Sequence, residues 1–331
     1  FPYTTLFRSV QDRFMRKDQA IKIQYASKYA SIANYWKKWI GETKGLKKSN
    51  AIAAKQKFEK ELTEKINKVG KQAEYGNLLT DFQKNYAEIK EYALARDLFS
   101  EVVLRNTESL QTGYKLYQLE QILANKGEQS FTDRKNTLSK GIDAFYKDYN
   151  NEVDKNVFEQ LITIYVNKMP KQFLPNGLET LNAQQLANDI YTQSSLTALD
   201  KFRALLEGDT QTVISKINTD KGYQLVKSLT DTYIKNVVPK LDELSIKNAT
   251  TQRTYMKAII ELSPKSARIF PDANSTLRVT YGKVKGYKPN DAVYYEPFTT
   301  LDGVMEKYIP GDYEFDVPQK LIDLYTAKDY G

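Results

Sequence analysis

The feature that most constrains the fold is a helical hydrophobic period that extends from about Gln11 to Leu262. Nearly every segment of this stretch carries apolar residues three and four positions apart, the spacing of one face of an α-helix. One such stripe consists of Phe58, Leu62, Ile66 and Val69. Because an apolar stripe of this kind must be buried against another element, the sequence predicts a large helical domain.

Glycine and proline residues predict where these helices end. Gly41 and Gly70 follow apolar stripes and are candidate C-terminal caps, whereas Gly113 and Gly127 are candidate breaks. Another helix is expected to stop near Met169-Pro170. Later helices are expected over residues 183–206 and 223–244.

The pattern changes after Pro264. Residues 276–281 alternate with the two-residue period of a strand, and a second extended stretch covers residues 292–299. Gly282, Gly286 and Pro289 are typical turn residues between them. A helical block followed by strands indicates separate domains, so we predict a helical domain over residues 10–265 and a β segment over residues 266–331.

The densest signal is the segment Tyr25–Gly45, YASKYASIANYWKKWIGETKG. Five apolar or aromatic residues share one face of this helix at spacings of 4, 3, 4 and 3: Tyr25, Tyr29, Ile32, Trp36 and Trp39. Both tryptophans of the chain lie here. We therefore predict that this face is core and that the helix is firmly held.

Asn34 is predicted to lie almost opposite that stripe, beside Ser27 and Ser31. An asparagine amide offers donor and acceptor atoms, so on a cleft wall it could hold the amino terminus of a peptide. On the pattern alone, a solvated surface position is the favoured alternative.

The chain contains no histidine and no cysteine among its 331 residues. It therefore cannot by itself form a Ser-His-Asp triad, a Cys-His dyad or a histidine-ligated metal site, and we predict neither metal nor cofactor. Residues 1–48 hold eleven Lys or Arg against three Asp or Glu, which accounts for the net charge of +8. No nucleic-acid motif accompanies this basic segment, so we expect a solvated face and no nucleic-acid partner. No apolar run is long enough for a membrane span.

Two segments resemble a known family. KYASIANYWKKWIG and FPDANSTLRVTYGKVKGY, which begin at Lys28 and Phe270, are similar to the bacterial dipeptidyl-peptidase 7 and dipeptidyl-peptidase 11 group, serine peptidase family forty-six. The resemblance continues through the terminal LYTAKDYG, which begins at Leu324, and covers essentially everything after the first nine residues.

The resemblance implies a chymotrypsin-like double β-barrel with a large helical domain inserted between its halves, so that this chain is mostly α with an incomplete C-terminal β-barrel segment. It implies a serine exopeptidase that releases dipeptides from the free N-terminus of a peptide substrate. In this family the catalytic His and Asp precede the matching segment and the Ser follows it. No catalytic residue is therefore expected here, and we expect an inactive fragment that caps the cleft.

The resemblance also implies that Asn34 is the helical-domain asparagine that hydrogen-bonds the substrate amino group. Trp36 is a second, weaker substrate-binding candidate, since its position favours packing. Asp272, Asn274 and Arg278 are given no catalytic role, because a Pro-Asp-Ala-Asn sequence is typical of a turn.

Phe1–Ser9, FPYTTLFRS, resemble the translation of a sequencing adapter, so we expect them to be an artefact without function. The family implies a periplasmic or cell-surface location, and a homodimer remains open. The competing hypothesis is a non-enzymatic helical scaffold or peptide-binding module with a small β appendage.

Overall fold

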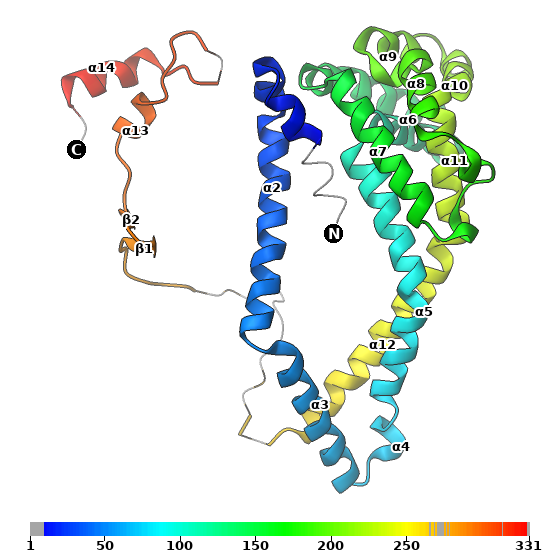
Figure 1. The fold of residues 1–331 in the computed structure, drawn as a ribbon, viewed down its shortest axis with the longest axis vertical. Coiled ribbons are helices and arrows are strands. Elements are labelled where there is room, and N and C mark those ends of the chain that lie inside the picture. The colour runs from blue at the N-terminus through cyan, green and yellow to red at the C-terminus, as the bar shows by residue number, and fades with distance from the viewer. Residues whose placement is uncertain are drawn as a thin grey trace. The chain divides into compact units, whose positions relative to one another are not determined.

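The computed structural model describes residues 10–264, 266–267, 269, 275, 277, 279–312 and 314–329. The chain divides into two compact units, Phe1–Ala267 and Arg268–Gly331. Helices dominate the described residues, which confirms the predicted mostly helical class (Figure 1). The adapter-like Phe1–Ser9, and Asp272, Asn274 and Arg278, lie outside the described residues.

The first unit is built from helices joined by short turns. A short helix over residues 10–15 precedes the long ones. The longer elements are α2 (Gln19–Lys48), α3 (Ala51–Lys68), α4 (Gln72–Tyr75), α5 (Leu78–Phe99), the π-helix η1 (Ser100–Asn106), α6 (Glu108–Lys147), α7 (Asn151–Lys168), α8 (Ala183–Gln193), α9 (Leu199–Leu206), α10 (Thr210–Thr219), α11 (Lys221–Asn236) and α12 (Val238–Leu262). Three short 3₁₀ turns, Lys171–Phe173, Leu178–Thr180 and Ser195–Thr197, connect α7, α8 and α9.

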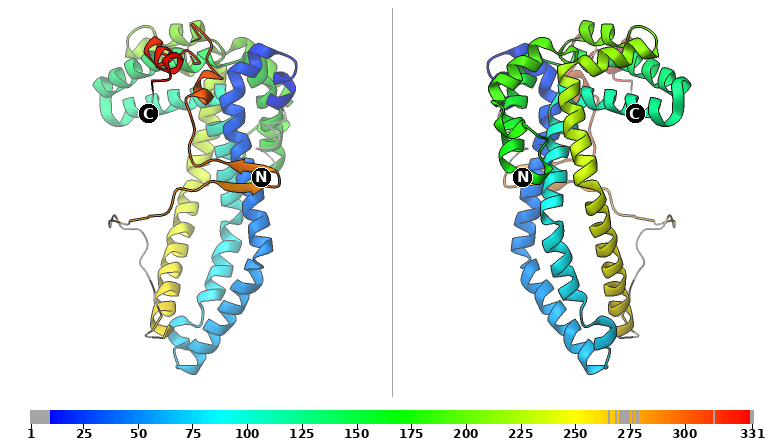
Figure 2. Two further views of the ribbon diagram at one scale, coloured as in Figure 1. Left: turned by 90° about the vertical axis from the view of Figure 1, so that its left-hand side faces the viewer. Right: turned by 90° about the vertical axis from the view of Figure 1, so that its right-hand side faces the viewer.

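Helices α6 to α11 gather at one end of this unit, which we call the head (Figures 1 and 2). Its cores contain fully buried aromatic side chains such as Phe131, Phe158, Phe202 and Tyr223. At the opposite end, α3, α4, α5 and α12 meet in what we call the stalk. The stalk has a small core of its own, formed by Leu62, Ile66, Tyr75, Leu78, Tyr255 and Ala258.

Some predicted helix boundaries are confirmed and others are wrong. Helix α3 ends before Gly70, which has φ of +72°, and α7 ends at Lys168, before Pro170. Gly127 is a kink within α6, with φ of +82°. Gly113, in contrast, lies within α6 without interrupting it. A Cβ there would lie 2.8 Å from Cγ2 of Val226 on α11. The glycine permits close packing between two helices rather than a break.

Two predicted single helices are each divided. The one predicted for residues 183–206 is α8 and α9, separated by the 3₁₀ turn at Ser195–Thr197. The one predicted for residues 223–244 is α11 and α12, which part at Val237. Pro239 in the first turn of α12 lacks the amide hydrogen that a continuous helix requires, so a new helix begins there.

The second unit contains a two-stranded antiparallel sheet, β1 (Tyr287–Asn290) with β2 (Val293–Tyr295), followed by α13 (Asp302–Met305) and α14 (Gln319–Ala327). Part of the second predicted extended stretch therefore forms β2. Two predictions are wrong. Pro289, expected in a turn, lies inside β1, where an edge strand tolerates it. The described residues of the first predicted strand, Leu277 and residues 279–281, have no regular structure, since no described strand offers them a hydrogen-bonded ladder.

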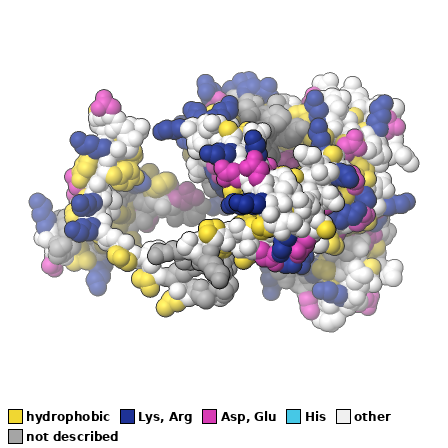
Figure 3. Space-filling view, turned by 90° about the horizontal axis from the view of Figure 1, so that it is seen from below, with side chains coloured by type: hydrophobic (Ala, Val, Ile, Leu, Met, Phe, Trp, Pro, Cys, Tyr) yellow, Lys and Arg dark blue, Asp and Glu magenta, His cyan; other side chains and the backbone are white. Residues whose placement is uncertain are grey.

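Charged side chains of both signs are interspersed over the helical unit on the face that Figure 3 shows. Among the helices that the structure describes, none combines the length and apolar character that a membrane crossing requires.

Candidate functional site

The site begins with α2, the helix that carries both predicted substrate-binding residues. The side chain of Asp18 caps its N-terminus by accepting hydrogen bonds from the amides of Ala20 and Ile21, at 2.7 and 3.4 Å. The helix continues past Gly41 to Lys48, so the predicted cap at Gly41 is wrong. An isolated glycine is tolerated within a helix at a modest cost. The chain turns at Asn50, which has φ of +49°.

The aromatic stripe of α2 is only partly core. Tyr25 is buried, whereas the other four stripe residues, Tyr29, Ile32, Trp36 and Trp39, are half-buried. Ile21 and Tyr25, both in the first two turns, are the buried residues of the helix. The prediction of a firmly held aromatic face is therefore right for its beginning and wrong for the two tryptophans. The reason is that one side of α2 borders an open pocket beyond Tyr25, although Ile32 still packs against the main core.

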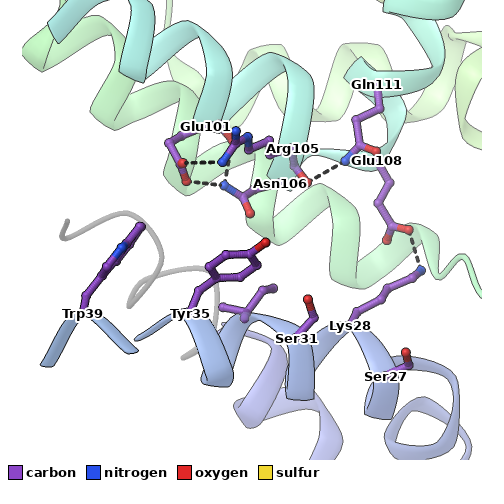
Figure 4. A pocket seen from close by; sticks show the side chains of 11 residues that line it. Ser27, Lys28, Ser31, Tyr35, Trp39, Glu101, Arg105, Asn106, Glu108 and Gln111 are labelled. Carbon is purple, nitrogen blue, oxygen red and sulfur yellow. Dashed lines mark hydrogen bonds and ion pairs between the residues drawn. The ribbon is translucent and has the colours of Figure 1, made fainter. Parts of the chain in front are cut away.

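That pocket, with a volume of about 460 Å³, lies between α2 and the segment formed by η1 and the start of α6 (Figure 4). It is lined by Ser27, Lys28, Ser31, Ile32, Tyr35 and Trp39 from α2, and by Glu101, Arg105, Asn106, Glu108 and Gln111 from the facing segment. The size is in the range of small-molecule sites, and its walls combine aromatic side chains with amide, hydroxyl and charged groups. A π-helix forms part of one wall, and such segments are frequent at functional sites.

On an ideal helical wheel, Asn34 and Trp36 fall just outside the positions of α2 that line the pocket, on opposite sides of them. At about 100° per residue, the lining positions of α2 occupy the arc from Ser27 to Ile32. On the same wheel Asn34 lies about 20° beyond the Ser27 edge, and Trp36 about 40° beyond the Ile32 edge. Asn34 is exposed and Trp36 half-buried, and neither lines the pocket. The substrate-binding role predicted for these two residues therefore stays a prediction.

Glu108 connects α2 to the head across the inner end of the pocket (Figure 4). Its Oε2 accepts a hydrogen bond from the Tyr25 hydroxyl at 2.6 Å, and its Oε1 pairs with Lys28 Nζ at 2.5 Å. Lys28 also donates to the backbone carbonyl oxygen of Asp148. The Tyr25 hydroxyl in turn accepts from the amide of Asn150 at 3.2 Å. We call Glu108, Tyr25 and Lys28 the α2 clamp.

Asp154 fixes the backbone of Glu108 and thereby supports the clamp. It is fully buried, and its two oxygens accept hydrogen bonds from the amides of Glu108 and Ser109, at 2.7 and 2.9 Å. The Tyr191 hydroxyl donates to it at 2.5 Å. These two amides would otherwise be unpaired at the N-terminus of α6, so Asp154 acts as a cap supplied by another helix.

The two buried carboxyl groups have perturbed acidity. Burial raises the pKa of Glu108 above its ordinary value, and the neighbouring Asp154 adds to the shift, while Lys28 opposes it. Burial also raises the pKa of Asp154, against the hydrogen bonds that Tyr191 and the α6 amides donate. Perturbed carboxyl groups beside a pocket are a common property of functional sites.

The outer wall of the pocket is held by contacts within its own segment. The side-chain amide of Asn106 donates to Oε2 of Glu101 at 2.8 Å, and Arg105 lies 3.9 Å from the other oxygen of that carboxylate. Gln111 donates to the carbonyl oxygen of Arg105 at 2.7 Å. Within the described ranges, no cluster of three or more acidic side chains is arranged to hold a metal ion.

Sequence reasoning identified α2 and missed the facing wall. Ser27 and Ser31 were recognised only as neighbours of Asn34, and nothing linked them to Glu101, Asn106 or Glu108. Lys28 and Glu108 are 80 positions apart, and no periodic pattern connects residues at that separation. The one available signal was the polar run Arg105-Asn106-Thr107-Glu108, which follows the apolar run Val102-Val103-Leu104.

A sequence model of the family described as Peptidase S46 matches residues 3–331. An Asp/Glu-specific dipeptidyl-peptidase of Flavobacterium psychrophilum is 63% identical over 322 residues, which cover 97% of this chain and 45% of the relative. A protein of the same description from Capnocytophaga gingivalis is 52% identical over 322 residues, with the same coverage.

The crystal structure of Porphyromonas endodontalis DPP11 in complex with the dipeptide Arg-Glu superposes with a TM-score of 0.65 at 25% sequence identity. The match covers 100% of this chain and 47% of that one. The chain therefore spans somewhat less than half the length of the proteins that it matches.

Proposed function

The chain belongs to the Peptidase S46 family, and on that premise we propose that it is part of a serine-type dipeptidyl peptidase that releases dipeptides from the free N-terminus of peptides. The support for this activity is the similarity to peptidases over 97% of the chain. Within such an enzyme, the helical unit would cap the substrate cleft and help to bind the substrate amino group. The parent fold would be a double β-barrel with this helical unit inserted, and the β1–β2 hairpin would belong to the second barrel.

The nucleophile, base and orienting carboxylate of the reaction are proposed to lie outside these residues. A serine peptidase of the triad type needs a histidine as its general base, and this sequence contains none. The contribution of this chain is therefore binding and orientation. Holding the substrate in a reactive geometry supplies a large part of the rate enhancement in such reactions.

Asn34 is the residue proposed to hold the substrate amine. Asn34 is exposed and lies three residues after Ser31, which lines the pocket, on a helix that the clamp fastens to the head, and this supports the proposed binding role. The Oδ1 atom would accept a hydrogen bond from the charged amine, and such a bond contributes about 1.5 to 3 kcal/mol. Trp36 is proposed to border the same substrate from the opposite side of the pocket.

The two relatives named above are described as Asp/Glu-specific, so we propose a preference for peptides with an acidic residue at the cleavage position. A periplasmic or cell-surface location and a homodimeric assembly are likewise proposed from the family. Each of these can be tested on the full-length protein, by fractionation and by light scattering respectively.

The decisive experiment uses the full-length protein that contains this chain, with and without Asn34→Ala, and peptides that end in Asp with a reporter group. We expect release of dipeptides from peptides with a free amine and none from acetylated ones. Asn34→Ala should lower kcat/KM by roughly 10- to 150-fold. Asn188→Ala, a matched control at an exposed position of α8, should leave kcat/KM unchanged.

Activity of the full-length protein on acetylated peptides would exclude an N-terminal exopeptidase. No cleavage of either peptide would favour the alternative function, a helical peptide-binding module. Dipeptide release that Asn34→Ala leaves intact would retain the peptidase and remove the amine contact.

A further inference from the structure

Helix α2 has its buried residues at one end and borders the pocket further along. Its buried residues, Ile21 and Tyr25, belong to the first two turns, and from Ser27 to Trp39 one side of the helix faces a hollow. Asn34 lies in this part, between the lining residues Ser31 and Tyr35. The direction in which α2 leaves the head therefore determines where the Asn34 amide lies.

Glu108 is the head residue whose side chain bonds two side chains of α2, while the backbones of Asp148 and Asn150 add one bond each to the same two side chains. One carboxylate oxygen accepts a hydrogen bond from the Tyr25 hydroxyl, and the other accepts one from the Lys28 ammonium. Tyr25 and Lys28 lie three positions apart on the same face of α2. Two contacts to one rigid group fix the helix against rotation as well as against tilt. Asp154 fixes the backbone of Glu108 itself, by accepting from its amide at 2.7 Å.

The length of the helix magnifies an error at the clamp. Asn34 is nine residues beyond Tyr25, or about 13 Å along the axis at 1.5 Å per residue. A tilt of about 5° at Tyr25 would move the Asn34 amide by about 1 Å, and a misplacement of that size can cost on the order of 100-fold in rate. Functional groups in enzymes have to be held within about 0.5 Å of their productive position.

We propose that Glu108 is a positioning residue for substrate recognition, which acts by holding α2 so that Asn34 meets the substrate amine. The proposal rests on the amine-binding role of Asn34 given above. It adds a residue that contacts no substrate atom and exerts its effect through Tyr25 and Lys28. The same contact would hold in place a binding residue that lies beyond the buried part of α2.

The test is a double-mutant cycle in the full-length protein, with Glu108→Gln and Asn34→Ala separately and together. Glutamine keeps the shape of the side chain, but its NH₂ group is a donor and cannot accept from one of the two donors. The substitution also removes the negative charge that pairs with Lys28. We expect Glu108→Gln alone to lower kcat/KM for free-amine peptides at least about tenfold. In the Asn34→Ala background, the same change should alter kcat/KM by less than about twofold, because its effect passes through Asn34.

The chain provides a matched control in Glu120 on α6. Its carboxylate accepts hydrogen bonds from the Tyr223 hydroxyl at 2.5 Å and from Lys227 Nζ at 2.8 Å. This Tyr-Glu-Lys cluster joins α6 to α11 and has no partner on α2 among its described hydrogen bonds. Glu120→Gln should lower the melting temperature to a similar extent and leave kcat/KM unchanged. A general loss of stability would affect both variants alike, whereas a positioning role affects one.

Effects of Glu108→Gln and Asn34→Ala that multiply would overturn the proposal, as would an unchanged kcat/KM in Glu108→Gln. If Glu108→Gln does not fold, Tyr25→Phe replaces it, since it deletes one hydroxyl and keeps the buried ring. If Asn34→Ala has no effect of its own, the amine contact fails and the proposal fails with it. That result is distinct from a strong Asn34→Ala effect that Glu108→Gln multiplies, which removes only the positioning role.

Discussion

Asp154 is the residue whose removal should most reduce the stability of the head. It is fully buried and accepts hydrogen bonds from two backbone amides of α6, at 2.7 and 2.9 Å, and from the Tyr191 hydroxyl. In Asp154→Ala both amides lose their partner in a site that water does not reach. Each orphaned buried donor costs about 1 to 3 kcal/mol.

The Tyr191 hydroxyl keeps one partner, because it also lies 2.8 Å from Oγ of Ser109. The variant also no longer has to bury a carboxylate, and this relief offsets part of the loss. We therefore expect Asp154→Ala to lower the free energy of unfolding by about 3 kcal/mol. That corresponds to a fall in melting temperature of roughly 6 to 12 °C for a unit of this size.

The measurement is urea unfolding of the 331-residue chain, followed by circular dichroism for the helices and by tryptophan fluorescence. Both tryptophans lie on α2, so fluorescence reports on the helix that the Asp154 network holds through Glu108. The control is Asp143→Ala, which removes an exposed ion pair with Arg203 and should cost less than about 1 kcal/mol. An Asp154→Ala variant as stable as this control would refute the reasoning from buried amides.

Three further predictions concern other parts of the helical unit. Burial and Asp154 raise the pKa of Glu108, so the folded chain keeps a proton that the unfolded chain releases above pH 4.5. Stability should fall as pH rises from 4.5 through the folded pKa, and urea unfolding of Glu108→Gln at rising pH should lack this fall. Gly113→Ala should lower the free energy of unfolding by about 1 to 3 kcal/mol in a thermal melt, because its Cβ would lie 2.8 Å from Cγ2 of Val226. Tyr255→Ala, at a buried position of the stalk, should speed proteolysis near α4 while the head resists.

The sequence predicted helices wherever an apolar stripe meets a clear stop, as in α3 before Gly70 and α7 before Pro170. It failed at two glycines for different reasons. Gly113 resembles a break, but α11 packs closely against it and the helix continues. Gly41 resembles a cap, but α2 continues through it to Lys48 although a Cβ there would meet no described atom within 4 Å. Local propensity does not contain this information.

The candidate site was predictable only on one side. The helical period placed Asn34 opposite the aromatic stripe, and the structure leaves it exposed, as that pattern required. The same period could not show that the stripe residues after Tyr25 are only half-buried. Coverage depends on η1 and α6, whose residues approach α2 only through the folding of the intervening chain.

One contact type recurs at three places among the described residues of the helical unit, and the three differ in how far the glutamate is buried. In each, a glutamate accepts a tyrosine hydroxyl and a lysine ammonium that lie three or four positions apart on a neighbouring element. The clusters are Glu108 with Tyr25 and Lys28, Glu120 with Tyr223 and Lys227, and Glu261 with Tyr75 and Lys71. The exposed fraction of the glutamate side chain rises through the series, from 10% to 21% to 33%.

The acidity of the first and last glutamates moves in opposite directions although their partners are the same. The bond from Lys71, followed by that from Tyr75, lowers the pKa of Glu261, because water still solvates that carboxylate. Burial raises the pKa of Glu108 despite its lysine. An ion pair that desolvation opposes is weaker than its short distances imply. The clamp on α2 is the most buried of the three clusters, and it is the cluster that borders the pocket.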